Sequence, residues 1–322
     1  METKNVLVTG GAGFIGSHLT KALVAAGHHV TVLDDFSNGD VRNVWSLLTE
    51  KKIRLVRGSI LDKHILDDIT HDVDTVFHLA AQIHVDRSVL EPEYTFDVNA
   101  IGTLNILELA KRRHFESIVY ASTSEIYGTA QTARMSESHP LNPQSPYAAS
   151  KLAADRLCNA YAETYGLPVT IIRNFNTYGP FQKDSGYGAV IPIFIRRVLS
   201  NKPPIIYGDG SQTRDFMYIE DAIRAYVLTM NGSPKERVLN FGSGQDISIL
   251  DLANLVISLC GKEGELEPVF MEGRAGEVKR LCCDISRSQR SLGFSPQYDI
   301  RSGLRTFIDW FRMYRFDEWK IG

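Results

Sequence analysis

The sequence predicts an α/β fold with a doubly wound parallel sheet. Short apolar runs alternate with longer stretches of helical periodicity over residues 5–174. The runs are apolar throughout, as in strands that are buried on both faces. A glycine-rich turn, "TGGAGFIG", joins the first run to the first helical stretch. Parallel strands with helices on both faces explain all three features.

The order of these patterns also predicts two regions. Strands are expected at residues 5–9, 29–34, 53–58, 75–80, 117–122 and 169–174, with helices between them at 14–26, 94–113 and 147–165. After "NTYGP" the chain becomes more polar and irregular, with helices expected near 189–200, 219–230, 248–260 and 301–315. We therefore divide it into residues 1–178 and a smaller α/β region, 179–322. The run 238–243 is a candidate strand that returns to the first region.

Composition excludes several classes of protein. The 322 residues are 43% hydrophobic, enough for a large core, and the net charge of −3 comes without a basic run. We therefore expect no nucleic-acid partner. No apolar run approaches the roughly 18 residues that span a bilayer, and the first strand begins too early to leave room for a signal peptide, so we expect a cytoplasmic protein with no membrane contact. The four cysteines lack metal-ligand spacing, and no metal is expected.

The glycine-rich turn predicts a dinucleotide site. Gly10, Gly13 and Gly16 stand between a strand and a helix, where backbone N–H groups can approach a pyrophosphate. The second strand ends in Asp34, 21 residues beyond Gly13. A carboxylate there accepts hydrogen bonds from ribose hydroxyls and repels a 2′-phosphate. The pattern therefore predicts a Rossmann-type site for NAD rather than NADP.

"SPYAASK" supplies candidate catalytic residues. Tyr147 and Lys151 are four residues apart and share one face of a helix. A free phenol has a pKa of about 10 and is a poor base at neutral pH, but a nearby ammonium lowers that pKa. Such a tyrosine can take the proton of a sugar hydroxyl while hydride leaves the same carbon for nicotinamide. Thr123, at the end of the strand 117–122, completes the set.

At these motifs the chain resembles the extended short-chain dehydrogenase/reductase family, the nucleotide-sugar epimerases and dehydratases. The resemblance runs over almost the whole length and includes "TGGAGFIGSHL", "HLAAQIHVDRS", "YASTSEIYG", "SPYAASK", "NFNTYGP", "GDGSQTRDFMYIEDA" and "RAGEVKR". It implies that Thr123 bonds the sugar 4-OH, that Tyr147 is the catalytic base, and that Lys151 binds the nicotinamide ribose. Two positions depart from the pattern: Ser59 stands where many members have an Asp near adenine, and "NFNTYGP" differs from the "NNYGP" of dTDP-glucose dehydratases.

The resemblance also implies two sets of binding residues. The NAD-binding residues are Gly10, Gly13, Phe14, Ile15, Gly16, Asp34, Asn38, Ile60, Ala80, Asn99, Tyr147 and Lys151. The residues for the nucleotide-diphosphate sugar are Asn176, Ala189, Val190, Tyr207, Arg214, Arg274 and Glu277. Of these, Arg214 and Arg274 match the two arginines that hold the diphosphate, and planar guanidinium groups suit phosphate oxygens.

Glu125 separates the reaction classes of this family. By the resemblance, classical 4-epimerases lack an acid here. dTDP-glucose dehydratases carry Asp-Glu after the threonine, whereas GDP-mannose dehydratases, some UDP-N-acetylglucosamine dehydratases and UDP-glucuronate decarboxylases carry Ser-Glu. After oxidation at C4 the C5 proton becomes acidic, and a carboxylate can remove it as the C6 hydroxyl is eliminated. Thr123-Ser124-Glu125 therefore favours an NAD-dependent nucleotide-sugar 4,6-dehydratase.

Several alternatives stay open. The runner-up is a nucleotide-sugar 4-epimerase of the UDP-glucose or UDP-N-acetylglucosamine type, in which Glu125 is a structural acid bonded to nearby backbone. A 5,6-dehydratase would use the same Glu125. A non-catalytic NAD-binding protein would not need Thr123, Tyr147 and Lys151. A reductase that releases NAD after each turnover fits less well with two diphosphate arginines.

The helical stretches 94–113 and 147–165 predict a homodimer. Both carry apolar side chains on more than one face, and the second face has to be buried somewhere. Relatives pair these two helices into a four-helix bundle between subunits.

Overall fold

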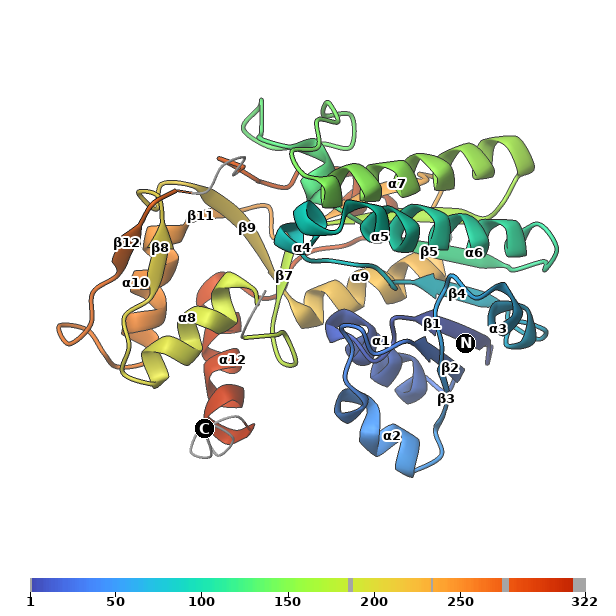
Figure 1. Cartoon of the computed structure of the whole chain (residues 1–322), viewed down its shortest axis with the longest axis horizontal. Coiled ribbons are helices and arrows are strands. Elements are labelled where there is room, and N and C mark those ends of the chain that lie inside the picture. The colour runs from blue at the N-terminus through green and yellow to red at the C-terminus, as the bar shows by residue number, and fades with distance from the viewer. Residues whose placement is uncertain (1, 185–187, 233, 274–277, 315–322) are drawn as a thin grey trace.

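A seven-stranded parallel sheet carries the fold (Figure 1). The computed structural model describes residues 2–184, 188–232, 234–273 and 278–314. The strand order is β10-β6-β5-β4-β1-β2-β3. It reverses between β1 and β4, and ligands of such sheets bind at this point, outside the carboxyl ends of the strands. The strands are β1 (Asn5–Thr9), β2 (His29–Asp34), β3 (Ile53–Arg57), β4 (Thr75–His78), β5 (Ser117–Thr123), β6 (Val169–Asn174) and β10 (Val238–Phe241).

Helices cover both faces of this sheet. Because side chains alternate along a strand, Val8 and Ile172 enter the core beneath one set of helices, and Leu7 and Ile171 enter the opposite core. The first face is covered by α1 (Phe14–Ala25) and α9 (Ile219–Gly232). The second is covered by α3 (Lys63–Asp68), α4 (Val85–Leu90), α5 (Pro92–Phe96), the π-helical turn η2 (Asp97–Ile101), α6 (Gly102–Ala110) and α7 (Pro146–Tyr165).

The predicted strands and helices of this region are confirmed to within a few residues. The strand expected at 75–80 ends at His78, because Leu79 and Ala80 leave the sheet and line a cavity. The candidate strand 238–243 is β10, which pairs in parallel with β6. The remaining short helices are η1 (Val41–Val44), α2 (Trp45–Thr49) and η3 (Ser124–Tyr127).

The second region, expected at residues 179–322, lies mainly at the left of Figure 1, and β7 leads into it from β6. Its small sheets have the orders β11-β9-β7 and β12-β8. Phe194 and Phe307 of this region belong to the same hydrophobic cluster as Val8, so the core continues past residue 178. Its elements are β7 (Asn176–Tyr178), α8 (Val190–Leu199), β8 (Ile205–Tyr207), β9 (Thr213–Tyr218), β11 (Asp246–Ser248), α10 (Ile249–Leu259), β12 (Val269–Met271), α11 (Ser286–Leu292) and α12 (Ile300–Tyr314).

A buried ion pair joins α7 to the sheet. Arg173 on β6 donates to Asp155 on α7 through Nε at 2.9 Å and Nη2 at 2.9 Å, and their side chains are 2% and 0% exposed. Asp155 also accepts from Ser122 Oγ at 2.8 Å, and Arg173 donates to the Tyr127 hydroxyl at 2.9 Å. Burial alone would raise the pKa of Asp155, but the hydrogen bonds and charges of Arg173 and Arg156 hold it below its usual value.

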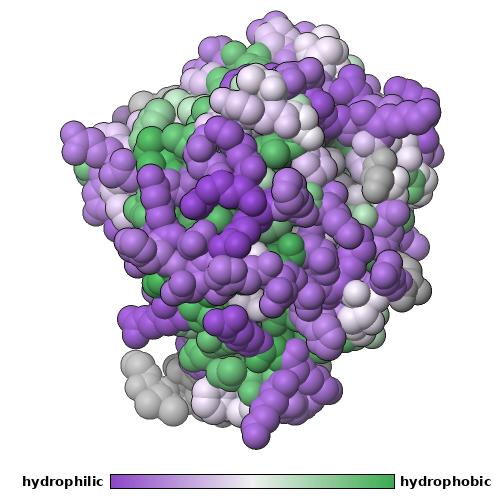
Figure 2. All heavy atoms as spheres, turned by 90° about the vertical axis from the view of Figure 1, so that its right-hand side faces the viewer, coloured by the Kyte–Doolittle hydropathy of each residue, from purple (hydrophilic) through white to green (hydrophobic). Residues whose placement is uncertain are grey.

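The surface is largely polar. Figure 2 shows the face at the right of Figure 1, where hydrophilic side chains predominate and smaller hydrophobic areas lie between them. Within the described ranges, every helix is too short or too polar to cross a membrane.

We predict that breaking the Asp155–Arg173 pair costs far more stability than breaking a surface pair. Arg173→Met leaves a buried carboxylate with only the half-exposed Arg156 as a cation, and it should lower the free energy of unfolding by about 3–5 kcal/mol. Urea unfolding at neutral pH measures the loss. Because the folded pKa of Asp155 is lowered, the pair's contribution disappears as the pH falls through that pKa.

The control for this prediction is Lys4→Met, which removes the exposed ion pair with Glu116. Such pairs contribute up to about 1 kcal/mol. Equal losses in the two variants would show that the buried pair does not hold α7 to the sheet.

Candidate active site

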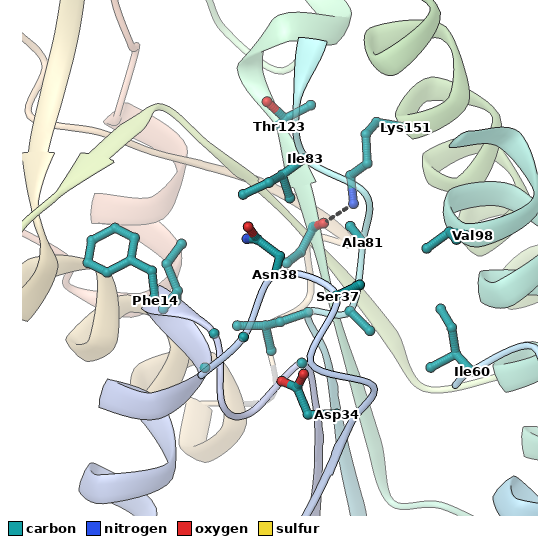
Figure 3. A pocket seen from close by; sticks show the side chains of 18 of the residues that line it. Phe14, Asp34, Ser37, Asn38, Ile60, Ala81, Ile83, Val98, Thr123 and Lys151 are labelled. Atoms are coloured by element: carbon teal, nitrogen blue, oxygen red, sulfur yellow. Dashed lines mark hydrogen bonds between the residues drawn. The ribbon is translucent and has the colours of Figure 1, made fainter. Parts of the chain in front are cut away.

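A cavity of about 280 Å³ opens at the carboxyl edge of the sheet (Figure 3). It lies where the strand order reverses, as expected for a dinucleotide. It brings together eleven of the twelve residues expected to bind NAD. These are Gly10, Gly13, Phe14, Ile15, Gly16, Asp34, Asn38, Ile60, Ala80, Tyr147 and Lys151.

The glycine turn leaves room for a ligand only because it carries no side chains. Gly10 has φ of +70°, and a Cβ there would lie 2.8 Å from the backbone nitrogen of Ala80. A Cβ on Gly16 would overlap the carbonyl oxygen of Gly10. The turn ends at Gly13, the N-cap of α1, whose free N–H groups and positive dipole end suit a pyrophosphate.

Asp34 ends β2 at the wall of the cavity (Figure 3). Its carboxylate accepts from the backbone N–H groups of Ala12 and Phe36, both at 2.9 Å. Burial raises the pKa of Asp34, and these two hydrogen bonds oppose the rise. Each oxygen keeps a second lone pair for a ribose hydroxyl. The neighbouring Asp35 instead accepts from the N–H and the hydroxyl of Ser37.

Gly39 is a cavity residue that sequence reasoning missed. A Cβ at this position would lie 2.6 Å from Oδ1 of Asp34 and would block the carboxylate. The signal was available, because a glycine five residues after a ribose-binding acid keeps that acid accessible.

Thr123 and Tyr147 meet at the end of β5. Thr123 caps η3, its Oγ1 accepting from the N–H of Glu125 at 3.2 Å, and it lies close enough to the Tyr147 hydroxyl to affect the pKa of that phenol. The Tyr147 side chain is buried. Burial raises the pKa of its phenol well above the usual value, the nearby Thr123 hydroxyl lowers it, and the charge of Glu125 raises it. The pKa of Tyr147 therefore depends on both Thr123 and Glu125.

Lys151 lines the cavity from α7. Its Nζ donates to the carbonyl of Ala121 at 2.6 Å and lies 4.4 Å from the ring centre of Tyr120 (Figure 3). Burial lowers the pKa of Lys151 to about 8. The phenol pKa of Tyr147 is raised rather than lowered, because its burial has a larger effect than the surrounding groups that lower it. Lys151 faces the cavity as a hydrogen-bond donor.

Glu125 follows the strand end on η3 and lies outside the lining of the main cavity. Burial raises the pKa of its carboxyl, and the positive charge of Arg214 opposes the rise. Across the described parts of the chain its side chain makes no hydrogen bond and no ion pair. A structural acid bonded to nearby backbone does not match this arrangement.

Asn99 also differs from expectation. It lies in the π-helical turn η2, behind the cavity wall. Its Oδ1 accepts from the N–H of Gln82, and its Nδ2 donates to Gln82 O and to Ser150 Oγ, each at 2.8–2.9 Å. Ser150 in turn donates to the carbonyl of Tyr147 at 2.8 Å. Asn99 thus supports the start of α7, and spacing alone could not reveal that its amide is bonded to Gln82 and Ser150.

The expected sugar-nucleotide residues are spread over the second region. Asn176 lines the cavity, and its strand β7 pairs with β9, which carries Arg214. Ala189 and Val190 begin α8. Tyr207 ends β8 and is 38% exposed. Arg274 and Glu277 lie outside the described residues.

Comparisons with known proteins identify relatives of this site. The family model described as GDP-mannose 4,6 dehydratase matches residues 7–307. A putative UDP-glucose 4-epimerase of Methanocaldococcus jannaschii is 38% identical over 95% of this chain and 98% of that protein. A dTDP-glucose 4,6-dehydratase of Actinoplanes is 35% identical over 96% and 98%. The crystal structure of a dTDP-glucose 4,6-dehydratase from Streptomyces venezuelae with NAD and TYD bound has a TM-score of 0.90 at 33% identity, covering 97% of this chain and 98% of that one.

We predict that Gly16→Ala abolishes retention of the expected NAD. The added methyl group would overlap the Gly10 carbonyl and force the turn away from the pyrophosphate. Nucleotide released from the denatured, purified protein measures retention. The matched control is Gly27→Ala at the other end of α1, where a Cβ meets nothing within 4 Å and only the φ of +87° is strained. Full NAD content in Gly16→Ala would place the pyrophosphate elsewhere.

Proposed function

Because the chain belongs to the family described as GDP-mannose 4,6 dehydratase, we propose that it is an NAD-dependent nucleotide-sugar 4,6-dehydratase. The chain is an enzyme of the nucleotide-sugar dehydratase and epimerase group, and NAD is the cofactor of that group. Relatives of both reaction types have similar identity to it. The choice between the two reactions therefore depends on the residues of the site.

Oxidation at C4 begins the proposed reaction. NAD, when bound, supplies a hydride acceptor and a positively charged ring beside Tyr147, and it returns the hydride later in the cycle. Thr123 accepts or donates at the sugar 4-OH, which places that oxygen against the phenol of Tyr147. Tyr147 can take the hydroxyl proton as C4 becomes a ketone only as a phenolate, a form that the positive charges of the bound nicotinamide ring and of Lys151 would favour against the effect of its burial. Lys151, which lines the cavity, would hold the nicotinamide ribose in reach of the sugar.

The unpartnered carboxyl of Glu125 carries the proposal. The new ketone makes the C5 proton acidic, and a base must be close by. Glu125 is close enough to Tyr147 for its charge to raise the phenol pKa, and its own pKa is raised by burial. A base whose pKa lies nearer neutrality transfers protons in both directions more readily. Glu125 therefore suits removal of the C5 proton.

The same carboxyl is the candidate acid for the leaving group. Ser124 stands where dTDP-glucose dehydratases have an Asp, and its side chain is 1% exposed and not acidic. After taking the C5 proton, Glu125 can give a proton to the departing C6 hydroxyl, so that water leaves and a C5–C6 double bond forms. Hydride addition at C6 and protonation at C5 then give the 4-keto-6-deoxy sugar. A 5,6-dehydratase would instead return hydride to C4 and keep the double bond.

A 4-epimerase is the second candidate, supported by the similarity to UDP-glucose 4-epimerases. It needs Tyr147 and Thr123 but no base at C5, because the 4-keto sugar only rotates in the site, so that hydride returns to the other face of C4. This reaction leaves the carboxyl of Glu125 without a use.

The substrate is proposed to be a nucleotide-diphosphate sugar held by the second region. Asn176 reaches the cavity from β7, and Arg214 lies on the strand that pairs with β7. Arg214 lies close enough to Glu125 to oppose the rise of its pKa. We propose that Arg214 binds the diphosphate. The N-terminal end of α8, at Ala189 and Val190, would bind the nucleotide.

We also propose a homodimer formed by α5, η2, α6 and α7. These helices lie side by side at the top of Figure 1 and leave apolar side chains exposed. Phe96 is 38%, Ile101 46% and Tyr165 50% exposed. A second copy of the chain would cover them.

We predict that Tyr147→Phe and Glu125→Gln fail at different steps. Tyr147→Phe removes the base for the C4 hydroxyl, so substrate should return unchanged. Glu125→Gln keeps shape but removes the C5 base, so 4-keto sugar should form without loss of water, and the elimination should slow by about 100- to 10,000-fold. Mass spectrometry of the sugar, and deuterium at C5 from heavy water, measure both steps.

The pH profile gives a further readout. As the pH is lowered, Glu125 becomes protonated and can no longer act as a base, so the elimination rate should fall. Because the pKa of Glu125 is raised, this fall should occur at a pH above the usual pKa of a glutamate. A wild-type protein that yields a C4 epimer, with no loss of water and no deuterium at C5, would establish the epimerase instead.

For the homodimer, we predict that Ile101→Glu gives a monomer. Two buried carboxylates at the centre of the proposed bundle would be costly to desolvate. Light scattering at micromolar concentration measures the mass. Met313→Glu on α12, where the side chain is 68% exposed, is the control and should stay dimeric. A monomeric wild type would contradict the interface.

A further inference from the structure

The short helix α4 buries a serine and exposes its apolar side chains. It packs against α5 and α7 on the second face of the sheet. Among the residues of α4, all of which the structure describes, Ser88 alone is buried, with 0% of its surface exposed. Val89 and Leu90 are 62% and 73% exposed. A surface helix ordinarily turns its apolar side chains inward, so the inward position of Ser88 points to a polar contact.

The hydroxyl of Ser88 has two partners, and the direction of each hydrogen bond is fixed. Its Oγ accepts from the backbone N–H of Tyr147 at 3.0 Å and donates to the carbonyl of Val85 at 2.6 Å. A backbone N–H can only donate and a carbonyl can only accept. The hydroxyl of Ser88 is therefore the acceptor for Tyr147.

The N–H of Tyr147 is the one that α7 leaves without an acceptor of its own. The first N–H groups of a helix have no partner inside it. The first residue of α7 is a proline, which has no N–H. The two N–H groups that follow Tyr147 donate to Ser145, one to its hydroxyl at 3.1 Å and one to its carbonyl at 2.9 Å. Ser88 thus completes the cap of α7 from a different helix.

The carbonyl of Tyr147 is linked to the same part of the chain. Ser150 Oγ donates to this carbonyl at 2.8 Å and accepts from Asn99 Nδ2 at 2.9 Å. Asn99 bonds both the N–H and the carbonyl of Gln82. The next residue, Ile83, lines the cavity (Figure 3). The peptide groups on both sides of the tyrosine are therefore tied to the segment that forms this cavity wall.

We propose that Ser88 is a positioning residue for Tyr147, and that by holding its backbone N–H it fixes the phenol relative to the cavity wall at Ile83. Ser88 lies outside the lining of the cavity, so it acts through Tyr147 and does not touch the sugar. The inference rests on the proposed function, in which Tyr147 is the base at C4. It applies to a dehydratase and to an epimerase, because both begin with oxidation at C4.

Ser88→Ala in the enzyme with its NAD tests the role. A misplacement of about 1 Å can slow a reaction by about 100-fold, so kcat for a nucleotide-diphosphate hexose should fall about 10- to 100-fold. KM and NAD content should not change. Hydrogen exchange resolved at single amides should become faster at Tyr147, whereas Ala148, which donates to Ser145, stays protected. Ser88→Cys, whose sulfur is a weaker acceptor, should lie between Ser88→Ala and wild type in both measurements.

Ser288→Ala on α11 is the matched control. Ser288 is also 0% exposed, and its Oγ donates to the carbonyl of Ile285, three residues earlier, at 2.9 Å, as that of Ser88 does to Val85. The control therefore removes the same hydroxyl and the same bond within a helix, but no contact with Tyr147. It should lose a similar amount of stability in urea and keep the wild-type kcat.

Three results would overturn the inference: an equal fall of kcat in the two alanine variants, an unchanged kcat in Ser88→Ala, or unchanged exchange at Tyr147 in that variant. A wild type that converts no nucleotide-diphosphate hexose would instead contradict the proposed function. Exchange at Tyr147 needs no substrate, so the contact with Ser88 is tested in that case too.

Discussion

The ion pair between Asp155 and Arg173 is the constraint on which the site depends. Asp155 lies one helical turn after Lys151, so the pair fixes the catalytic face of α7 against β6. The same two side chains also hold residues 123–126 from both ends. Asp155 accepts from Ser122, just before this segment, and Arg173 donates to Tyr127, just after it. The distance between the base on α7 and the groups on β5 and η3 is therefore set by one buried interaction.

This constraint explains why a core strand ends in three hydroxyls and an acid. Ser122 points to the α7 face and bonds Asp155. Thr123 points the other way, caps η3 and meets Tyr147. Ser124 is buried, and the carboxyl of Glu125 makes no hydrogen bond within the described chain. Each of the four positions has a different surrounding, although the sequence presents them as one polar run.

The sequence predicted the large sheet and the cavity because both depend on local patterns. Strands buried on two faces are apolar throughout, and the turn at Gly16 tolerates no side chain. The three-residue strands β7, β8, β11 and β12 were not predicted, since three residues carry no periodicity. The placement of Asn99 also escaped, because its amide is bonded to Gln82 and Ser150, and the hydrogen-bond partners of an amide are a tertiary property.

The choice between dehydratase and epimerase finally concerns the desolvation of one carboxylate, that of Glu125. Removing a carboxylate from water without a compensating hydrogen bond is unfavourable, and burial raises the pKa of Glu125 accordingly. Arg214 offsets only part of this, and a bound diphosphate would compete for its charge. An epimerase gains nothing from such a group, because its chemistry is complete with Thr123 and Tyr147. A dehydratase needs a group that takes a proton from C5 and gives one to the C6 oxygen, and a raised pKa assists both transfers. The carboxyl whose pKa is raised by burial is thus the one that the proposed elimination would use.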